Sequence, residues 1–360
     1  MRRLRPIRPA LLLMAFWCVI APAPTSQGGM GDPKRQQPTF TARTDAVRLD
    51  VVVTDGGKPL AGLEARDFDV LDNGVPQKAT LVARGGAVTV LPVLDTSDSV
   101  AGDRLRELAA AARTLVGLLH TEDLVGLMTF SDRPLLRVPL VQGGLDPAAI
   151  STAIGLVRPG GLTAMYDALA TGLMLAAPDA GGSLLLLFSD GADTSSYLSP
   201  DAVLDAVRRA GVVVYVVAAG LPAPSTGQTW TAPDRHERFL RSVVEASGGQ
   251  LLRAEFSRRR LGDAFTQVLN EFRTRYVLTY TPEGVGRDDG WHKLEVSLKP
   301  TAREKGVARR ASVVRVRAGY YAPGPVGRGS PVVSRSADVG PARQTQAQGA
   351  ASSTRRKPVY

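Results

Sequence analysis

The pattern of hydrophobic and polar positions changes character twice along the chain. From Val47 to Arg84, short β-branched runs are interrupted by Gly-Gly and Asn-Gly turn signals, which is typical of short antiparallel strands. From residue 87 to residue 275, apolar runs of strand length alternate with segments of helical period. After Tyr276 the β-type runs return and helical periodicity is absent. The pattern therefore predicts an α/β segment with β structure on both sides of it.

The middle segment predicts a doubly wound, mostly parallel sheet. Its first strand, AVTVLPVL from Ala87, is almost continuously apolar, as expected for a strand that is buried on both faces. Strands and helices that take turns after it indicate an α/β fold of this class. The further strands are expected at 124–130, 183–188, 212–218 and 250–254, with an edge strand at 135–141, and the helices at 104–119, 147–157, 164–176, 200–210, 233–246 and 261–275.

The two β flanks indicate how the domains are organised. Since both ends of the folded part have β character, the most economical architecture is a middle domain inserted into one small antiparallel β module built from both flanks. Two separate β pieces also fit the pattern. The expected divisions are a signal peptide (1–26), a linker (27–39), an N-terminal β module (40–86), the α/β domain (87–275), C-terminal strands that complete the module (276–324) and a basic, disordered tail (325–360).

The N-terminal segment predicts secretion. Four arginines precede an apolar stretch centred on residues 10–20, and Ala21-Pro22-Ala23 supplies small residues for cleavage. We therefore expect a secreted or periplasmic protein with no membrane span after cleavage, or, alternatively, one anchored by an uncleaved signal. Because Cys18, the only cysteine, lies in this stretch, the mature protein has neither a disulfide nor a thiolate metal site.

The formal net charge of +10 does not indicate a nucleic-acid partner. Residues 1–35 carry six basic and one acidic side chain, and residues 325–360 carry the same numbers, which leaves 32 of each sign between them. A surface that binds nucleic acid shows as a basic stripe on the folded part, and this balance does not support one. We expect no specific nucleic-acid binding.

Oxygen-bearing side chains follow the predicted strands at the edge where ligands bind in open parallel sheets. Asp95, Ser97 and Ser99 come directly after the first buried strand, Thr163 follows Gly160-Gly161 before a helix, and Asp190 follows the strand SLLLLF. These loops supply carboxylates and hydroxyls but no histidine or sulfur. Such ligands suit a hard cation, Mg²⁺, Mn²⁺ or Ca²⁺, rather than zinc or copper.

This set of motifs resembles the metal-ion-dependent adhesion site of the von Willebrand factor type A domain. The motifs are D-x-S-x-S after the first strand, a threonine in a Gly-Gly-x-Thr loop and an aspartate in a strand-end S-D-G. The flanks, with VVVTDGGKPLAGLEARDFDVLDNG, RTRYVLTYTP and GYYAP, resemble a secreted branch of this family described from acidobacteria. The resemblance implies that Ser97 and Ser99 contact the ion directly, that Thr163 does so at least in the ligand-bound state, and that Asp95 and Asp190 hold it largely through water.

The resemblance also implies a function, namely divalent-cation-dependent binding or adhesion to a protein that presents Asp or Glu. Hydroxyl ligands are neutral, so the ion keeps much of its charge and accepts a carboxylate from a partner. Family members often have glycine at the place of Asp98, so this chain adds a carboxylate to the loop.

Several other interpretations stand beside this one. Asp95 and Ser97 are also good caps for the following helix, Asp167 and Asp193 suit capping or solvated positions, and a structural envelope protein with a vestigial metal site fits the same motifs. A metal-dependent hydrolase or phosphotransferase is a weaker alternative. Position 97 lacks the second carboxylate that such phosphotransferases need, and no phosphate-binding Gly-x-x-x-x-Gly-Lys loop or Gly-x-Ser-x-Gly elbow is present. The three histidines have structural or surface roles by default. We therefore expect no enzymatic activity.

Overall fold

The structure is a computed structural model that describes residues 46–142, 147–176, 182–189, 193–219, 235–254, 257–286, 290–304 and 312–322. The predicted signal peptide, the linker, the basic tail and Asp190 lie outside these residues, so these predictions stay predictions.

The α/β domain is built on a six-stranded sheet with the strand order β11-β10-β9-β6-β7-β8. All neighbours are parallel except β7 and β8, which pair antiparallel. Strand β8 lies at one edge of the sheet, as the sequence predicted. Every residue of β9 and β10 is buried, which agrees with their continuous apolar runs. The bounds are β6 Val88–Asp95, β7 Leu124–Phe130, β8 Pro134–Gln142, β9 Gly182–Ser189, β10 Val213–Ala219 and β11 Leu251–Ala254.

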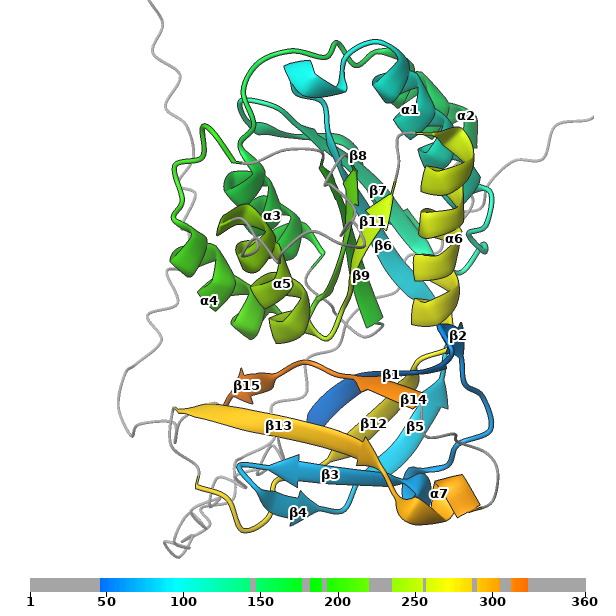
Figure 1. Cartoon of the computed structure of the whole chain (residues 1–360), viewed down its shortest axis with the longest axis vertical. Helices are drawn as coiled ribbons and strands as arrows, with labels where there is room; N and C mark the ends of the chain where they lie inside the picture. Colours follow the sequence, from blue (N-terminus) through cyan, green and yellow to red (C-terminus); the bar gives the residue numbers. More distant parts are fainter. Residues whose placement is uncertain are drawn as a thin grey trace, which may run out of the picture. The chain divides into compact units, whose positions relative to one another are not determined.

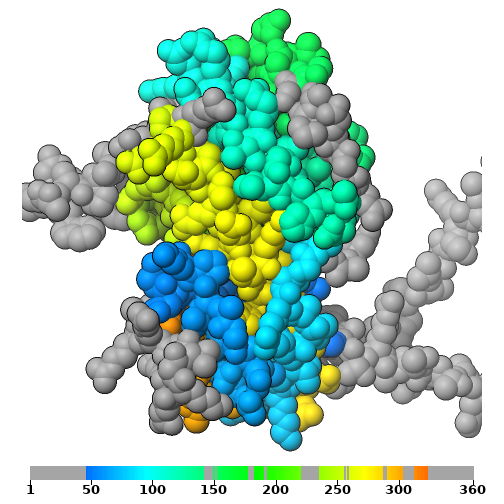
Figure 2. All heavy atoms as spheres, turned by 90° about the vertical axis from the view of Figure 1, so that its right-hand side faces the viewer, coloured from blue at the N-terminus to red at the C-terminus, as the bar shows by residue number. Residues whose placement is uncertain are grey.

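Helices cover both faces of this sheet (Figure 1). One apolar core lies between the sheet and α1, α2 and α6, and a second lies between the sheet and α3, α4 and α5. Figure 2 shows α6 in yellow beside α1 in cyan on the first of these faces. The bounds are α1 Asp103–Val116, α2 Pro147–Gly155, α3 Met165–Leu175, α4 Pro200–Ala210, α5 Arg235–Ser247 and α6 Arg258–Arg273. The predicted doubly wound α/β class is confirmed.

Two helices differ from their predicted bounds for local reasons. Helix α1 ends at Val116 rather than at residue 119, because the N–H groups of Leu118 and Leu119 bond the carbonyls three residues back, at Leu115 and Val116, instead of four. Helix α6 begins one turn earlier than predicted, at Arg258, because the hydroxyl of Ser257 accepts a hydrogen bond from the Arg260 N–H and caps the first turn.

The residues on either side of the α/β domain form two antiparallel sheets that share one apolar core. One sheet has the order β14-β1-β12-β5, with β2 paired to β1, and the other has the order β15-β13-β3-β4. Strand β1 pairs with β12 and β14, and β3 pairs with β13, so each sheet contains strands from both flanks of the sequence, and the two flanks alternate in the first sheet. The bounds are β1 Val47–Asp55, β2 Lys58–Pro59, β3 Phe68–Asp72, β4 Val75–Gln77, β5 Thr80–Arg84, β12 Tyr276–Tyr280, β13 Trp291–Leu298, β14 Ser312–Arg315 and β15 Gly319–Tyr321, with the short helices η1 Ala65–Asp67 and α7 Pro300–Glu304.

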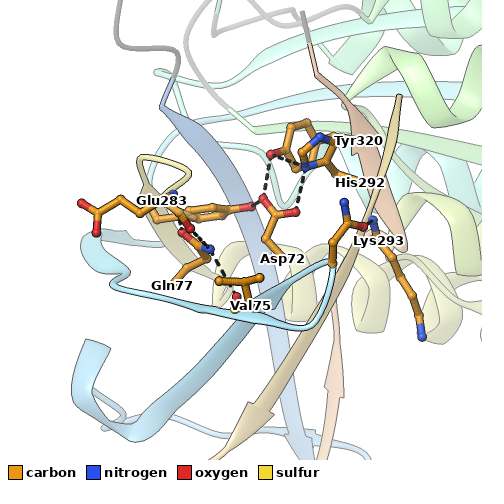
Figure 3. Close-up of polar contacts among 9 residues, drawn as sticks. Asp72, Val75, Gln77, Glu283, His292, Lys293 and Tyr320 are labelled. Atoms are coloured by element: carbon orange, nitrogen blue, oxygen red, sulfur yellow. Dashed lines mark hydrogen bonds and ion pairs between the residues drawn. The ribbon is translucent and has the colours of Figure 1, made fainter. Parts of the chain in front are cut away.

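A buried polar cluster joins the two flanks inside this β module (Figure 3). The carboxylate of Asp72, which is fully buried, accepts hydrogen bonds from the hydroxyls of Tyr280 at 2.8 Å and Tyr320 at 2.7 Å. Its other oxygen lies 2.9 Å from Nδ1 of His292. Because Asp72 comes from the N-terminal flank and its partners from the C-terminal flank, this cluster requires the two flanks to pair in one register.

Ion pairs connect the β module with the α/β domain. The guanidinium of Arg275, 1% exposed, donates to the Asp50 carboxylate of β1 at 2.7 Å. Arg315 of β14 pairs with Glu271 of α6. The Tyr321 hydroxyl of β15 donates to Asp205 of α4 at 3.0 Å. Strands from both flanks therefore contact the α/β domain.

Each helix within the described ranges is too short or too polar to cross a lipid bilayer.

Candidate metal centre

The candidate site lies where the strand order of the parallel sheet reverses direction. Strand β6 lies between β9 and β7. The next strands in the chain, β7 and β8, lie on one side of β6, and the later strands β9, β10 and β11 lie on the other. In open α/β sheets, the crevice beyond the carboxyl ends of the strands at such a switch point is where ligands bind. Asp95 ends β6 and Ser189 ends β9, and the Ser189 hydroxyl donates to Asp95 Oδ2 at 2.7 Å.

The first loop gathers the predicted oxygen ligands around Asp95, which is fully buried. Its Oδ1 accepts hydrogen bonds from the Ser97 hydroxyl at 2.7 Å and from the Ser97 backbone N–H at 3.0 Å. The hydroxyls of Ser97 and Ser99 are 3.1 Å apart. The structure therefore brings these three predicted residues together in one contiguous set of oxygens.

Backbone hydrogen bonds hold the second loop against the first. The N–H of Gly160 donates to the Thr96 carbonyl at 3.0 Å, and the N–H of Asp98 donates to the Gly161 carbonyl at 3.2 Å. Gly161 has a φ of +87°, a conformation that disfavours other residues, and a Cβ there would lie 2.3 Å from Oδ2 of Asp132. The two glycines are thus needed for the close approach of the loops and are more than a flexible helix entrance.

Thr163 is placed by a third segment, residues 193–198. Its N–H donates to the Thr194 hydroxyl at 2.9 Å, and its carbonyl accepts from the backbone N–H groups of Thr194 at 2.8 Å and Ser195 at 3.3 Å. The Thr163 side chain is buried, and among the described residues its hydroxyl takes part in no hydrogen bond. This hydroxyl is therefore available to a ligand.

Two further carboxylates near the site have positioning roles. Asp193 accepts from the Tyr166 N–H at 3.1 Å, at the start of α3. Asp167 accepts from the backbone N–H groups of Tyr197 and Leu198, both at 3.0 Å. Both side chains thus act as caps and loop anchors, and the capping role is one that the sequence analysis allowed.

Asp98 and Asp132 bring exposed carboxylates to the Gly160-Gly161 loop. Oδ1 of Asp132 accepts from the Leu162 N–H at 2.7 Å. Oδ1 of Asp98 lies 3.5 Å from the position that a Cβ on Gly160 would occupy. The additional carboxylate of Asp98 therefore lies at the rim of the site and does not enter the buried set around Asp95, although its backbone N–H helps to join the loops.

The observed spacing of the oxygens fits a small, hard cation. In an octahedral shell with metal–oxygen distances of ~2.0–2.1 Å, neighbouring oxygens are roughly 2.9 Å apart. The distance of 3.1 Å from Ser97 Oγ to Ser99 Oγ, the two hydroxyls that the resemblance assigns to direct contact, is close to this value. The donor set of one carboxylate and hydroxyls also matches such ions. In the part of the chain that the structure describes, no three His, Cys, Asp or Glu side chains form a separate metal-binding group.

The alternative in which Asp95 and Ser97 cap the following helix is wrong. The residue that precedes α1 is Gly102, and no side chain caps that helix. Ser97 precedes the short helix η2 (Asp98–Val100), but its hydroxyl bonds Asp95 instead of the helix N–H groups.

Sequence reasoning gave Ser189 no role of its own and missed Asp132 and Thr194. Ser189 belongs to the S-D-G motif, and its position at the strand end was the only signal for it. The roles of Asp132 and Thr194 depend on contacts with residues about thirty positions away, at Leu162 and Thr163, and no local pattern indicates them.

Comparison with known proteins identifies the family to which the α/β segment is similar. The family model described as the von Willebrand factor type A domain matches residues 90–247. This match confirms the resemblance that the three loop motifs indicated. The resemblance of the flanks to a secreted acidobacterial branch stays a prediction. A comparison with curated protein sequences gave no match.

Solved structures with a similar fold come from diverse sources. An aerotolerance-related membrane protein from Bacteroides fragilis is 20% identical, with a TM-score of 0.41 over 52% of this chain and 98% of that chain. A von Willebrand factor type A protein from Catenulispora acidiphila is 11% identical, with a TM-score of 0.44 over 78% of this chain and 75% of that chain. Proximal thread matrix protein 1 from the mussel byssus, solved with zinc in its MIDAS motif, is 18% identical, with a TM-score of 0.43 over 55% of this chain and 49% of that chain.

Proposed function

Because residues 90–247 form a von Willebrand factor type A domain, we propose that this protein is a divalent-cation-dependent binding module that accepts a carboxylate from a protein partner. The proposed ligands are Asp95, Ser97, Ser99, Thr163 and Asp190. Domains of this family mediate protein–protein interaction and bind a divalent metal ion at such a site, and the proposal assigns both properties to named residues of this chain.

One observation supports the proposal above all others. The oxygens of Asp95, Ser97 and Ser99 lie 2.7 and 3.1 Å from one another at the sheet's switch point, and the loop that carries Thr163 is hydrogen-bonded to the loop that carries them. A turn or a helix cap needs none of this convergence.

The residues have different roles in the proposal. Ser97, Ser99 and Thr163 supply neutral hydroxyls directly, while Asp95 and Asp190 balance charge and orient water molecules. Asp95 also holds the Ser97 hydroxyl in place through its hydrogen bond, and Ser189 fixes the other carboxylate oxygen. When bound, a divalent cation would supply positive charge and an exchangeable coordination position for the partner's Asp or Glu.

The oxygen donors favour Mg²⁺, with Mn²⁺ and Ca²⁺ as further candidates. The N-terminal pattern of charged and apolar residues supports action in the secreted space or the cell envelope. The partner is a protein that presents an acidic side chain. We propose neither nucleic acid nor a catalytic substrate as a ligand.

Two histidines that a hydrolase could use have other contacts. His120 contacts Arg273 and Glu122, and His292 is buried against Asp72 in the β module. These contacts favour a binding module over serine chemistry at Ser97, which needs a general base within hydrogen-bond reach.

The proposal is tested by capture of partners from an envelope extract in Mg²⁺ and in chelator. The wild-type chain should retain partners in Mg²⁺ and release them in chelator, while Ser97→Ala should retain none in either condition. The matched control is Ser242→Ala on α5, which removes a hydroxyl that bonds only the Arg238 carbonyl and should behave as the wild type. Capture that is equal in chelator, or unchanged by Ser97→Ala, would indicate a structural protein with a vestigial site.

A further inference from the structure

Three large apolar side chains are exposed on the two segments that meet at the proposed ligand Thr163. Leu162, which directly precedes Thr163, is 57% exposed, and Tyr197 and Leu198 are 96% and 41% exposed. Tyr197 and Leu198 belong to the segment 193–198, whose backbone is hydrogen-bonded to Thr163. Exposed apolar side chains that gather around one site are typical of interaction surfaces.

Hydrogen bonds fix the backbone that carries these side chains. The N–H groups of Tyr197 and Leu198 both donate to the Asp167 carboxylate at 3.0 Å. The Ser196 hydroxyl accepts from the N–H of Tyr166 at 3.0 Å and from that of Asp167 at 3.2 Å. The N–H of Leu162 is held by Asp132. A preorganised surface of this kind loses little conformational entropy when a partner binds.

The same rim has an acidic part. The carboxylates of Asp98 and Asp132 lie against Gly160 and Gly161, the two residues that precede Leu162. Asp98 is exposed, and among the described residues its carboxylate has no hydrogen-bond or ion-pair partner. A second acidic side chain on the partner would approach these carboxylates and be repelled.

We propose that the partner segment carries a single Asp or Glu directly flanked by a large apolar residue, with no second acidic residue beside it. This inference rests on the proposed function, because the acidic residue is the one that the metal centre accepts. Leu162 and Tyr197 contact the apolar neighbour, and Asp98 and Asp132 exclude acidic neighbours. The rim therefore determines which carboxylates the site accepts.

The test uses random short peptides displayed on phage and the immobilised full chain. Peptides are bound in Mg²⁺ and eluted with chelator from the wild type, from the double variant Leu162→Ser Tyr197→Ser and from Ser97→Ala. Since both rim side chains are exposed, the thermal unfolding midpoint of the double variant should equal that of the wild type. The affinity of one selected synthetic peptide is then measured for each chain.

On the wild type, chelator-eluted peptides should carry one acidic residue next to Leu, Ile, Met, Phe, Tyr or Trp. The double variant should keep the acidic residue, lose the apolar preference and bind the synthetic peptide about tenfold more weakly. Acidic peptides without an apolar neighbour, or an equal apolar preference on the double variant, would overturn this inference and leave the proposed function standing. If the wild type yields no chelator-eluted acidic peptides, the proposed function fails and this inference with it.

Discussion

The hydroxyl of Ser189 donates to Oδ2 of Asp95 at 2.7 Å, across 94 positions of the sequence. Ser189 ends β9 and Asp95 ends β6, and these strands are parallel neighbours in the sheet. The bond therefore joins the loops that follow the two strands at the switch point. Because the strands are buried and fully paired, the proposed metal ligands rest on a rigid support.

Replacing Asp98 with Asn should strengthen the binding of a carboxylate partner. Asp98 adds a negative charge at the rim, and its removal leaves the centre more positive without removing a proposed ligand. At saturating Mg²⁺, the affinity for an acidic peptide should rise by roughly two- to fivefold, the range of an exposed charge interaction. Fluorescence anisotropy with a labelled acidic peptide measures this change. The control is Asp103→Asn, an exposed carboxylate that pairs with Arg106; equal affinities for the two variants would show that Asp98 does not act on the site.

Replacing Gly161 with Ala should impair the metal centre more than the fold. The φ of Gly161 is +87°, and a Cβ added there would lie 2.3 Å from Asp132 Oδ2. The Asp132 carboxylate, which holds the Leu162 N–H, or the loop itself therefore has to move, and the positive φ costs a further ~1–2 kcal/mol. Mn²⁺ affinity should fall about tenfold or more, while circular dichroism stays unchanged. Gly155→Ala at the end of α2 meets no atom within 4 Å and should have wild-type affinity. Equal Mn²⁺ affinities of the Gly161→Ala and Gly155→Ala variants would contradict the described loop contact.

Replacing Asp50 with Ala should destabilise the whole folded unit. Burial lowers the pKa of the Arg275 guanidinium, and the Asp50 carboxylate opposes this effect. Without Asp50, the buried guanidinium loses its charge partner, which costs about 3–5 kcal/mol in the free energy of unfolding. Urea unfolding measures the loss. Asp263→Ala removes an exposed partner of Arg259 at 4.0 Å and should change stability little; similar losses for the two variants would show that Arg275 is not held as described.

The β module should lose stability at alkaline pH through the tyrosines around Asp72. Burial, followed by the hydrogen bond to Asp72, raises the pKa of both Tyr280 and Tyr320. A raised folded-state pKa gives stability that is fully present below the unfolded value of about 10 and is lost as the pH rises above it. The free energy of unfolding should therefore fall above about pH 10, by up to about 1.4 kcal/mol per pH unit for each tyrosine.

The double variant Tyr280→Phe Tyr320→Phe is the control for this alkaline effect. Burial also raises the pKa of Tyr215 and Tyr276, but these groups are present in both chains, so the difference in slope reports the Asp72 cluster alone. Urea unfolding at several pH values should give a shallower decline for the double variant. Parallel curves would mean that the two hydroxyls are not buried in the folded state.

The sequence predicted the α/β class because buried parallel strands leave a strong local signal. The runs that became β6, β9 and β10 are continuously apolar, and buried helix faces repeat between them. Helix ends were less predictable, since they depend on single local hydrogen bonds, such as those of the Leu118 N–H at the end of α1 and of the Ser257 hydroxyl at the start of α6.

The pairing inside the β module was beyond the reach of local pattern. The register of Val47 opposite Tyr280, or of Asp72 opposite Leu294, is set by contacts between residues more than 200 positions apart. The buried cluster of Asp72, His292 and Tyr320 has no local signal, because its members are polar residues that look exposed in the sequence.

The candidate site was predictable in its ligands but not in its supports. Asp95, Ser97 and Ser99 form one short motif, and the structure places them within hydrogen-bond distance of one another. The contacts of Ser189 with Asp95 and of Thr194 with Thr163 arise only when the strands are assembled. Support of this kind depends on the fold, so a single sequence does not reveal it.

The most direct test of the proposed metal centre is a titration of the purified full chain with Mn²⁺. The electron paramagnetic resonance signal of the free ion measures how much Mn²⁺ the chain has bound. The wild type and Ser242→Ala should each take up a single ion per chain, in competition with Mg²⁺. The double variant Ser97→Ala Ser99→Ala should remain folded and take up none. Uptake by the double variant equal to that of the wild type, or no uptake by the wild type, would contradict the assignment of these hydroxyls as metal ligands.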